Sequence, residues 1–207
     1  MSYAKTPFCN RSPFLNERAP MYCNLDRLLD GCFKARAGRA PPPRVALLIE
    51  GFPRPHHPLM EFTKLLFLLR EHDAKATFVV DWYDIRERGL CASVGQMMQL
   101  LTHNEHEVAV KFKKVACTAT HLRQQAVEAL HFLQRVYGIT VVSAKAGCQM
   151  PGTAAALQAL GITVVDGVRA QHVVNDGADV IRDVEMALQA LRGQKCVCVS
   201  QLKEGAS

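Results

Sequence analysis

The sequence lacks any apolar run that approaches the roughly 18–20 residues of a membrane-spanning helix. Its N-terminus also lacks the short apolar block that marks a secretory signal. The first absence argues against a helical membrane protein and the second against secretion. We therefore expect a soluble intracellular protein, cytoplasmic or organellar, with a mitochondrial location included.

Proline is scarce after residue 44, and so is net charge. Of the ten prolines in the 207 residues, six lie in residues 1–44, where a packed helix or a central strand would not tolerate them. The same segment has eight Lys and Arg residues against three acids, so it carries +5 of the formal charge of +6. We predict a basic, proline-rich arm over 1–44 and one nearly neutral globular domain over 45–207.

Closely spaced cysteines are also rare. Eight cysteines are present, but only Cys196 and Cys198 lie close together, at a spacing that would put both sulfurs on one face of a strand. Disulfide frameworks are typical of small secreted proteins, whereas this chain is long enough to bury its own core. Zinc-binding pairs usually have Cys-x2-Cys or wider spacing. We expect buried or free thiols in a reducing compartment and no metal site at this pair.

Segments typical of strands and helices alternate after the arm. Apolar, β-branched runs predict strands at 44–50, 75–80, 106–112, 140–144, 162–165 and 195–199. Apolar residues at helical spacing predict helices at 59–72, 93–102, 118–137, 153–160 and 183–191. This alternation indicates an α/β fold of parallel strands, whose functional residues gather at the carboxyl ends of the strands. The residues at those ends are Glu50, Asp81, Lys111, residues 146–152, Asp166 and Ser200.

Three blocks of sequence resemble a known family. They are Val-Ala-Leu-Leu-Ile-Glu-Gly-Phe-Pro at 45–53, Arg-Glu-His-Asp-Ala-Lys-Ala-Thr-Phe-Val-Val at 70–80 and Asn-Glu-His-Glu-Val-Ala-Val at 104–110, and residues 121–167 continue the pattern. In this order they are similar to the polysaccharide deacetylases, the NodB-homology domains of carbohydrate esterase family four. The resemblance implies an irregular (β/α) barrel of parallel strands, here with an extended N-terminal arm. It also implies a metal-dependent hydrolase that removes acetyl groups from N-acetylated sugars.

The residues that hold the metal in this family have no counterparts here. The family's first motif has two adjacent acids, a general base and a metal ligand, where this chain has Glu50 and Gly51. The family's His-x3-His ligand pair falls on Lys111 and Val115. Neither residue is an imidazole, and an ammonium group would repel a cation. The metal-bound water that such hydrolases use as nucleophile therefore has no ligand set.

The two later motifs of the family are also missing. Its third motif contains an arginine, but residues 147–150 of this chain contain none. Its late leucine-histidine pair falls near Val199 and Ser200. We therefore assign no catalytic residue and no metal ligand. Glu50, Lys111 and Ser200 are degenerate equivalents of the family's site, and the pattern predicts a pseudoenzyme without a cofactor.

One substitution suggests how the site is compensated. Lys111 follows its strand at the position of a metal ligand, and Glu50 ends the first strand. We hypothesise that a Glu50–Lys111 ion pair replaces the metal, which requires good geometry because both charges lose water. A nitrogen-to-oxygen separation well beyond ~4 Å would contradict this pair.

Two other activities would use the same strand ends. An atypical carbohydrate deacetylase or amide hydrolase of this family would need zinc or another divalent metal. A metal-dependent nuclease is a remote alternative, because residues 45–51 also resemble the first strand of nuclease domains that bind magnesium through several acids. Glu50, Asp81 and Asp166 would then be the ligands.

Histidine and aromatic residues near these ends have two interpretations each. His56 and His57 lie in a proline-rich loop, where they are either solvated or part of a rebuilt metal site. His106 matches a family position that is not a ligand, and His103 is expected at a helix end, where a cation suits the helix dipole. Trp82 and Tyr83 lie between two acids, Asp81 and Asp84. This segment either lines a sugar pocket or forms a capped turn in which Trp82 covers the barrel mouth.

These observations together predict a catalytically inactive, polysaccharide-deacetylase-like protein that is a structural or interaction subunit of a larger assembly, with a ribonucleoprotein as one candidate. Its partners would be protein subunits that bind the arm, and RNA. The expected binding residues are Arg11, Arg18, Arg36, Arg39, Arg44, Lys111, Lys113 and Lys114. The run from Lys111 to Lys114 is alternatively a solvated strand end.

Deletion of residues 1–44 tests where RNA attachment resides. We expect the deletion to abolish salt-dependent RNA binding, because the arm carries the excess positive charge, and to leave the domain folded. Filter binding to RNA at several salt concentrations, with circular dichroism as a folding control, measures both effects. If RNA binding is undiminished after the deletion, the run from Lys111 to Lys114 is the better candidate for the RNA-binding site.

Overall fold

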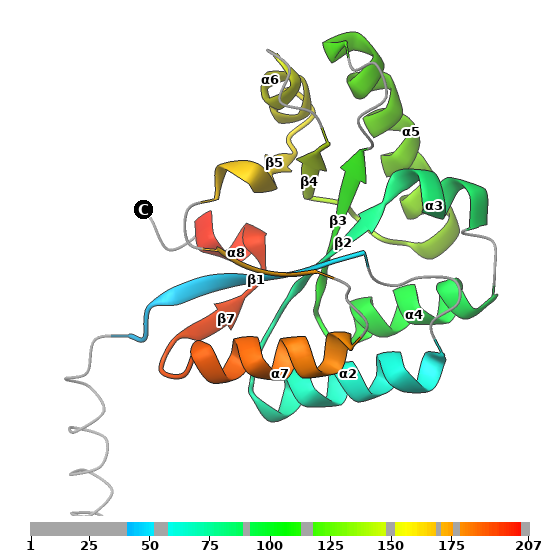
Figure 1. Cartoon of the computed structure of the whole chain (residues 1–207). Helices are drawn as coiled ribbons and strands as arrows, with labels where there is room; N and C mark the ends of the chain where they lie inside the picture. The colour runs from blue at the N-terminus through cyan, green and yellow to red at the C-terminus, as the bar shows by residue number, and fades with distance from the viewer. Residues whose placement is uncertain are drawn as a thin grey trace, which may run out of the picture. The chain divides into compact units, whose positions relative to one another are not determined.

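A parallel sheet of seven strands forms the centre of the fold, with helices packed against it (Figure 1). The computed structural model describes residues 41–51, 58–88, 92–112, 118–147, 152–168, 171–175 and 179–203. The strands in these ranges are β1 (Arg44–Glu50), β2 (Thr77–Asp81), β3 (Glu107–Phe112), β4 (Ser143–Ala146), β5 (Thr163–Val164), β6 (Gln171–Asn175) and β7 (Lys195–Val197). The helices are α2 (Leu59–Glu71), α3 (Trp82–Arg88), α4 (Ala92–His103), α5 (Ala119–Tyr137), α6 (Thr153–Gln158), the 3-10 helix η1 (Val165–Gly167), α7 (Val180–Ala190) and α8 (Val199–Lys203).

The strand order places β1 near the middle of the sheet. The order is β5-β4-β3-β2-β1-β6, and β7 also pairs with β1. β6 pairs with residues 46–50 of β1, whereas β7 pairs with residues 44–46. Every pairing is parallel, and the sheet curls into a half-barrel (Figure 1). This topology confirms the predicted α/β fold of parallel strands joined by helices.

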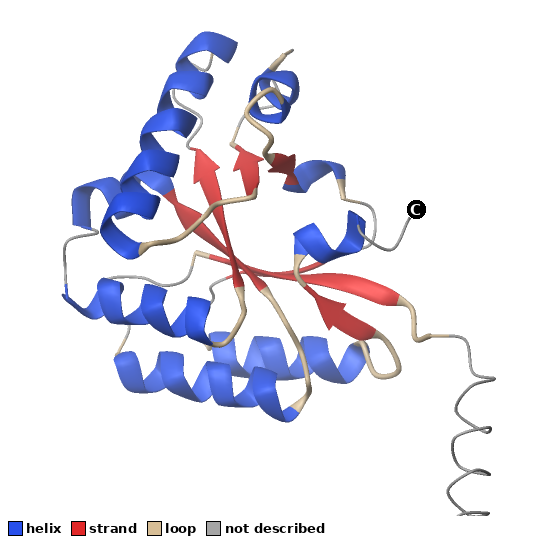
Figure 2. Ribbon diagram, turned by 180° about the vertical axis from the view of Figure 1, so that it is seen from behind, coloured by secondary structure: helices blue, strands red, loops and turns tan. Residues whose placement is uncertain are grey.

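The outer face of the sheet forms the larger core. Leu47 and Ile49 of β1 and Phe78 of β2 pack with Phe62 and Leu65 of α2, and all five side chains are fully buried. The rings of Phe62 and Phe78 meet edge to face, with centroids 6.0 Å apart. α2, α4 and α7 cover this face (Figure 2). Within the ranges given above, no helix combines the length and apolar content needed to span a bilayer.

The inner face of the curled sheet forms a second, smaller core. Side chains alternate along each strand, so the residues between those of the outer core point inward. The curled face leaves little room, and small side chains fill it together with residues from η1 and α8. The cluster consists of Ala46, Leu48, Val79, Ala109, Val165 and Val199. Burial on both faces explains why β1 is a continuous apolar run in the sequence.

The turns that end the helices separate into two kinds. Gly138 and Gly161 follow α5 and α6, and their φ angles of 69° and 75° are in the left-handed region that favours glycine. Asp73 follows α2 and Glu105 follows α4, and both adopt the same left-handed conformation, with φ of 48° and 59°. This conformation is unfavourable for residues with a Cβ atom. These two turns, which lack glycine, follow the neighbouring helices α2 and α4 on one side of the sheet.

We did not predict α3, η1, β6 or α8 from the sequence, and the formation of β6 and α3 depends on their neighbours. β6 is a short strand with polar residues at Gln171, His172 and Asn175, and it forms because residues 46–50 of β1 offer it a pairing edge. α3 begins directly after β2, without a loop. The Asp81 carboxylate accepts the backbone N–H groups of Tyr83 at 2.9 Å and of Asp84 at 3.4 Å, which caps the new helix.

Five of the six predicted strands have different bounds in the structure, and two of these differences affect the interpretation of individual residues. The strand expected at 140–144 lies at Ser143–Ala146, because Ile139 and Val141 are buried in the larger core before pairing begins. The strand expected at 195–199 ends at Val197, since Val199 begins α8. Cys198 therefore lies outside β7, and the prediction that both sulfurs share one face of a strand is wrong.

Cys196 and Cys198 are buried free thiols, as expected for a chain that is long enough to bury its own core. The Cys198 Sγ atom donates a hydrogen bond to the carbonyl of Ala76 at 3.4 Å. Burial raises the pKa of Cys196 and raises that of Cys198 to about 12, so both thiols stay protonated and inert at neutral pH. The other six cysteines lie outside the described residues.

Replacement of Phe78 by alanine tests the larger core. We expect Phe78→Ala to lower the free energy of unfolding by about 3–5 kcal/mol, because a fully buried ring is removed and a cavity remains. Phe67→Ala on α2 is the matched control, since that ring is 49% exposed, and we expect a loss of about 0.5–1 kcal/mol. Urea unfolding measures both values, and equal losses would contradict the assignment of Phe78 to the core.

Candidate functional site

The carboxyl ends of β1 and β3 bring Glu50 and Lys111 together. Glu50 is level with Val79 of β2 and Ala109 of β3 in the sheet register. Lys111 lies two residues beyond Ala109 and points to the same face, so its side chain can lean back across β2 toward Glu50. Its Nζ atom lies 3.1 Å from Oε2 of Glu50. This distance confirms the predicted Glu50–Lys111 ion pair.

Lys145 is a second cation at the same carboxylate, which the sequence analysis missed. It lies on β4, directly opposite Lys111 in the register, and its Nζ atom contacts Oε1 of Glu50. The same Nζ atom lies 3.9 Å from Oδ1 of Asp166 in η1. The strand was expected to end at residue 144, which placed Lys145 in a loop. The alternation of Ser143 and Lys145 on one face of a longer strand is the signal that would have found it.

Burial and the two lysines act on Glu50 in opposite directions. The side chain of Glu50 is only 8% exposed, and this burial alone would raise its pKa. Hydrogen bonds and charge from Lys145 and Lys111 outweigh burial and lower the pKa of Glu50 below its ordinary value. Partial burial raises the pKa of Asp166, which the nearby lysines only partly offset. Glu50 is therefore a well-compensated carboxylate and a weak base.

The residues around Glu50 do not fit a divalent metal. Each oxygen of its carboxylate already contacts an ammonium group. An ammonium group has three donors and no lone pair for a metal, and its charge repels a cation. Among the described residues, no three His, Cys, Asp or Glu side chains form a group that could hold a metal ion. The arrangement is an ion-pair cluster of Lys111, Lys145, Glu50 and Asp166.

Asp81 and Trp82, which follow one another at the end of β2, form a helix cap and a part of the outer core. The Oδ1 atom of Asp81 caps α3, which confirms the capped-turn interpretation. Trp82 is 4% exposed and packs edge to face on Phe132 of α5, with ring centroids 5.7 Å apart. The prediction that Trp82 covers the barrel mouth is wrong, because the ring belongs to the outer core.

Two of the four candidate histidines fall in the described ranges. His106 is half-buried, and its Nδ1 atom accepts the backbone N–H of Ala76 at 3.3 Å. Burial, with the charge of Lys75, lowers the pKa of His106 to about 4, so the ring is neutral at neutral pH. His103 ends α4, as expected from the helix dipole. His56 and His57 lie outside the described residues.

Ser200 is held at the amino-terminal ends of the strands, not at Glu50. Its backbone N–H donates to Oε2 of Glu107, the first residue of β3, at 3.0 Å. The preceding N–H, of Val199, donates to Oγ1 of Thr77, the first residue of β2, at 2.9 Å. Ser143 donates its hydroxyl to the other oxygen of Glu107. Ser200 therefore belongs to a network that secures α8 inside the half-barrel.

The expected RNA-binding residues fall mostly outside the described ranges. Arg11, Arg18, Arg36, Arg39, Lys113 and Lys114 lie there. Arg44 is exposed at the start of β1, and its Nη1 atom donates to the carbonyl of Gln201 at 3.4 Å. Lys111 is 38% exposed but is engaged by Glu50. Within the described chain, Arg44 is thus the more accessible of the two predicted cations.

Several solved structures are similar to this chain. A CE4 family pseudoenzyme from Bacillus anthracis superposes with a TM-score of 0.59 at 12% identity, over 79% of this chain and 66% of that one. The peptidoglycan deacetylase PdaC from Bacillus subtilis has a TM-score of 0.58 at 11% identity, over 79% of this chain and 90% of that one. A family 4 carbohydrate esterase from Bacillus anthracis has a TM-score of 0.57 at 14% identity, over 86% and 92% of the two chains.

The sequence comparisons add no relative. No family model matches the chain, and no curated protein matches it significantly. The chain spans about two thirds of the length of the pseudoenzyme. At identities of 11–14% the structural likeness shows the fold, a curled (β/α) barrel of parallel strands, as the resemblance of the three sequence blocks implied.

Replacement of Glu50 by glutamine tests the ion-pair cluster. At neutral pH we expect Glu50→Gln to lower the unfolding free energy by about 1–3 kcal/mol, because two partly buried ammonium groups lose their charged partner. The pKa of Glu50 is lower in the folded chain than its ordinary 4.5. The carboxylate therefore stabilises the fold above that pH, and its contribution is lost as the pH falls through the folded-state pKa. Urea unfolding of both proteins from neutral to acid pH measures this difference.

Glu87→Gln is the matched control for this experiment. Glu87 also pairs with a cation, Arg86 at 3.3 Å, but both side chains are exposed, so we expect a change of about 0.5 kcal/mol or less. An advantage of wild type over Glu50→Gln that persists unchanged at acid pH would contradict the role of the Glu50 charge.

Proposed function

We propose that this chain, which has the fold of the CE4 polysaccharide deacetylases, is a catalytically inactive member of that structural class and a structural or interaction subunit of a larger assembly. The observation that carries the proposal is the contact of both Glu50 oxygens with lysine ammonium groups. Metal-dependent hydrolysis needs a cation that acidifies water and a separate base that accepts the proton. Here the cation's place is taken by Lys111 and Lys145, and the base has a lowered pKa.

The charges at the barrel mouth support the inactive interpretation. Glu50 and Asp166 face two lysines, so the cluster is formally neutral and offers no net attraction to a divalent cation. The fold itself does not depend on a metal, because its larger core packs on the outer face of the sheet, away from Glu50. A solved pseudoenzyme among the similar structures indicates that this fold can be retained without the reaction.

The interaction role is supported by the distribution of charge in the sequence. Residues 1–44 carry +5 of the formal charge of +6, and the domain is nearly neutral. A basic segment attached to a neutral folded domain is suited to hold that domain on a polyanion such as RNA, or on an acidic protein surface. We propose that the domain supplies packing surfaces and the arm supplies attachment within the assembly.

Metal content and acetate release test the inactive state together. We expect the purified full chain to retain no stoichiometric zinc, cobalt, nickel or manganese after incubation with each ion and desalting. We also expect no release of acetate from N-acetylglucosamine oligomers in the presence of those ions. Any residual release should be equal in Glu50→Gln, which would assign it to a contaminant. Stoichiometric metal with acetate release that Glu50→Gln abolishes would establish the atypical deacetylase instead.

Sedimentation of the native protein tests the subunit role. The full chain in a cell extract should sediment far ahead of a 22.9 kDa monomer. Treatment with ribonuclease distinguishes a ribonucleoprotein, where the fast-sedimenting fraction shifts, from an assembly of proteins alone. Sedimentation only at the monomer position would contradict the proposal.

A further inference from the structure

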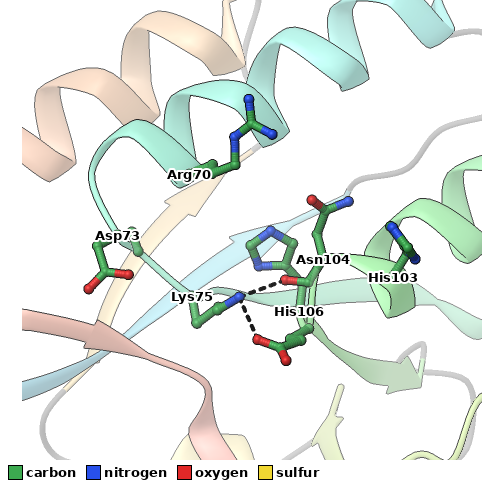
Figure 3. A pocket seen from close by; sticks show the side chains of 8 residues that line it. Arg70, Asp73, Lys75, His103, Asn104 and His106 are labelled. Atoms are coloured by element: carbon green, nitrogen blue, oxygen red, sulfur yellow. Dashed lines mark hydrogen bonds and ion pairs between the residues drawn. The ribbon is translucent and has the colours of Figure 1, made fainter. Parts of the chain in front are cut away.

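Two adjoining cavities lie between α2 and α4, at a distance from the barrel mouth. The first has a volume of about 200 Å³ and is lined by the turns that follow the two helices (Figure 3). The second has a volume of about 170 Å³ and lies between the helices themselves. Arg70 and Asn104 line both cavities, so the two form one groove. This groove opens at the amino-terminal ends of β2 and β3, whereas Glu50 lies at a carboxyl end.

The two halves of the groove differ in polarity. Leu66 and Phe67 of α2 and Leu100 of α4 line the second cavity. Lys75 and His106 line the first, together with Arg70. An apolar wall next to a few converging donors is the usual composition of a site for a small organic ligand.

Arg70 is the first free donor in the groove. Its guanidinium lies over the ring of Phe67, 4.5 Å from the centroid. Within the described chain it makes no ion pair with a carboxylate. Stacking on an aromatic face leaves the N–H groups at the edge of a guanidinium available for a planar acceptor such as a carboxylate.

His106 is the second free donor. Because its Nδ1 atom accepts the N–H of Ala76, the proton of the neutral ring is on Nε2. The ring is fixed in place by an edge-to-face contact with Phe78, with centroids 5.5 Å apart. His106 lines the first cavity, and its Nε2–H is a donor of fixed orientation.

The remaining charges do not neutralise Arg70. Lys75 pairs with Glu105 at 2.9 Å and donates to the carbonyl of Asn104 at 2.9 Å (Figure 3). The carboxylate of Asp73 extends away from Arg70 and His106, and His103 lies on the far side of Asn104 (Figure 3). The guanidinium of Arg70 is thus the uncompensated charge at the junction of the apolar and polar halves.

We propose that this groove binds a small organic carboxylate with an apolar body, such as an aryl or branched alkyl acid. The carboxylate accepts N–H groups from Arg70 and the Nε2–H of His106, and the apolar body lies against Leu66, Phe67 and Leu100. Charge-assisted, bidentate hydrogen bonds to arginine give this recognition both strength and orientation. The site is separate from the ion-pair cluster at Glu50 and does not depend on the proposed function of that cluster.

Titration of the full, 15N-labelled chain with benzoate tests the site. We expect saturable shifts of amides in α2 and α4 and of the Nε2 resonance of His106. Benzamide has the same ring without the charge, and acetate has the charge without the ring. Each should bind about tenfold more weakly, which corresponds to the loss of one charged hydrogen bond or of the apolar contact. Equal affinity for benzamide, or no saturation by benzoate, would overturn the proposal.

Arg70→Ala provides the variant test, with Arg86→Ala as its matched control. Arg86 is also exposed on a helix and lies over an aromatic ring, that of Tyr83, with its guanidinium 5.8 Å from the centroid, but it does not line the groove. We expect Arg70→Ala to weaken benzoate binding about tenfold and Arg86→Ala to leave it unchanged. Equal effects of the two variants would overturn the assignment of Arg70. Unchanged thermal unfolding of Arg70→Ala confirms that a loss of binding is not a loss of folding.

Discussion

The carboxylate of Glu50 loses most of its hydration inside the curled sheet, and the structure compensates this loss with two ammonium groups. Lys111 and Lys145 reach it because both lie two residues further along their strands, on the same inward face. Val79 and Ala109, level with Glu50, are small enough to let the lysine side chains cross above them. The centre of the barrel mouth is therefore an internal salt-bridge cluster.

At the opposite end of the half-barrel, neutral hydrogen-bond donors compensate the burial of another carboxylate. Glu107 is buried at the start of β3, and its oxygens accept the Ser143 hydroxyl and the backbone N–H of Ser200. Thr77 accepts the N–H of Val199 beside it. These bonds hold α8 against the inner face, where Val199 completes the smaller core. Buried polar groups are tolerated here because each has a partner.

The larger core is independent of both polar ends. Its residues lie on the outer face of the sheet and on α2, α4, α5 and α7, so changes at Glu50 or Lys111 leave its packing intact. This separation is consistent with a fold that is shared with solved structures at only 11–14% identity, because the packing of the outer core does not involve the charged groups at the strand ends. The groove between α2 and α4 belongs to the same layer of helices on the outer face of the sheet. It is lined by these two helices and by the turns at which they end.

The sequence by itself determined the alternation of strands and helices, the burial of β1 on both faces and, through the family resemblance, the pairing of Glu50 with Lys111. The periodicity of apolar residues is a local signal, so it can be interpreted from the sequence without a known fold. Only the tertiary structure decided that Lys145 joins the same carboxylate and that β6 pairs with β1. It also brought Arg70 and His106 to one groove. Each of these depends on strand register or helix packing between residues far apart in the chain, which no local pattern encodes.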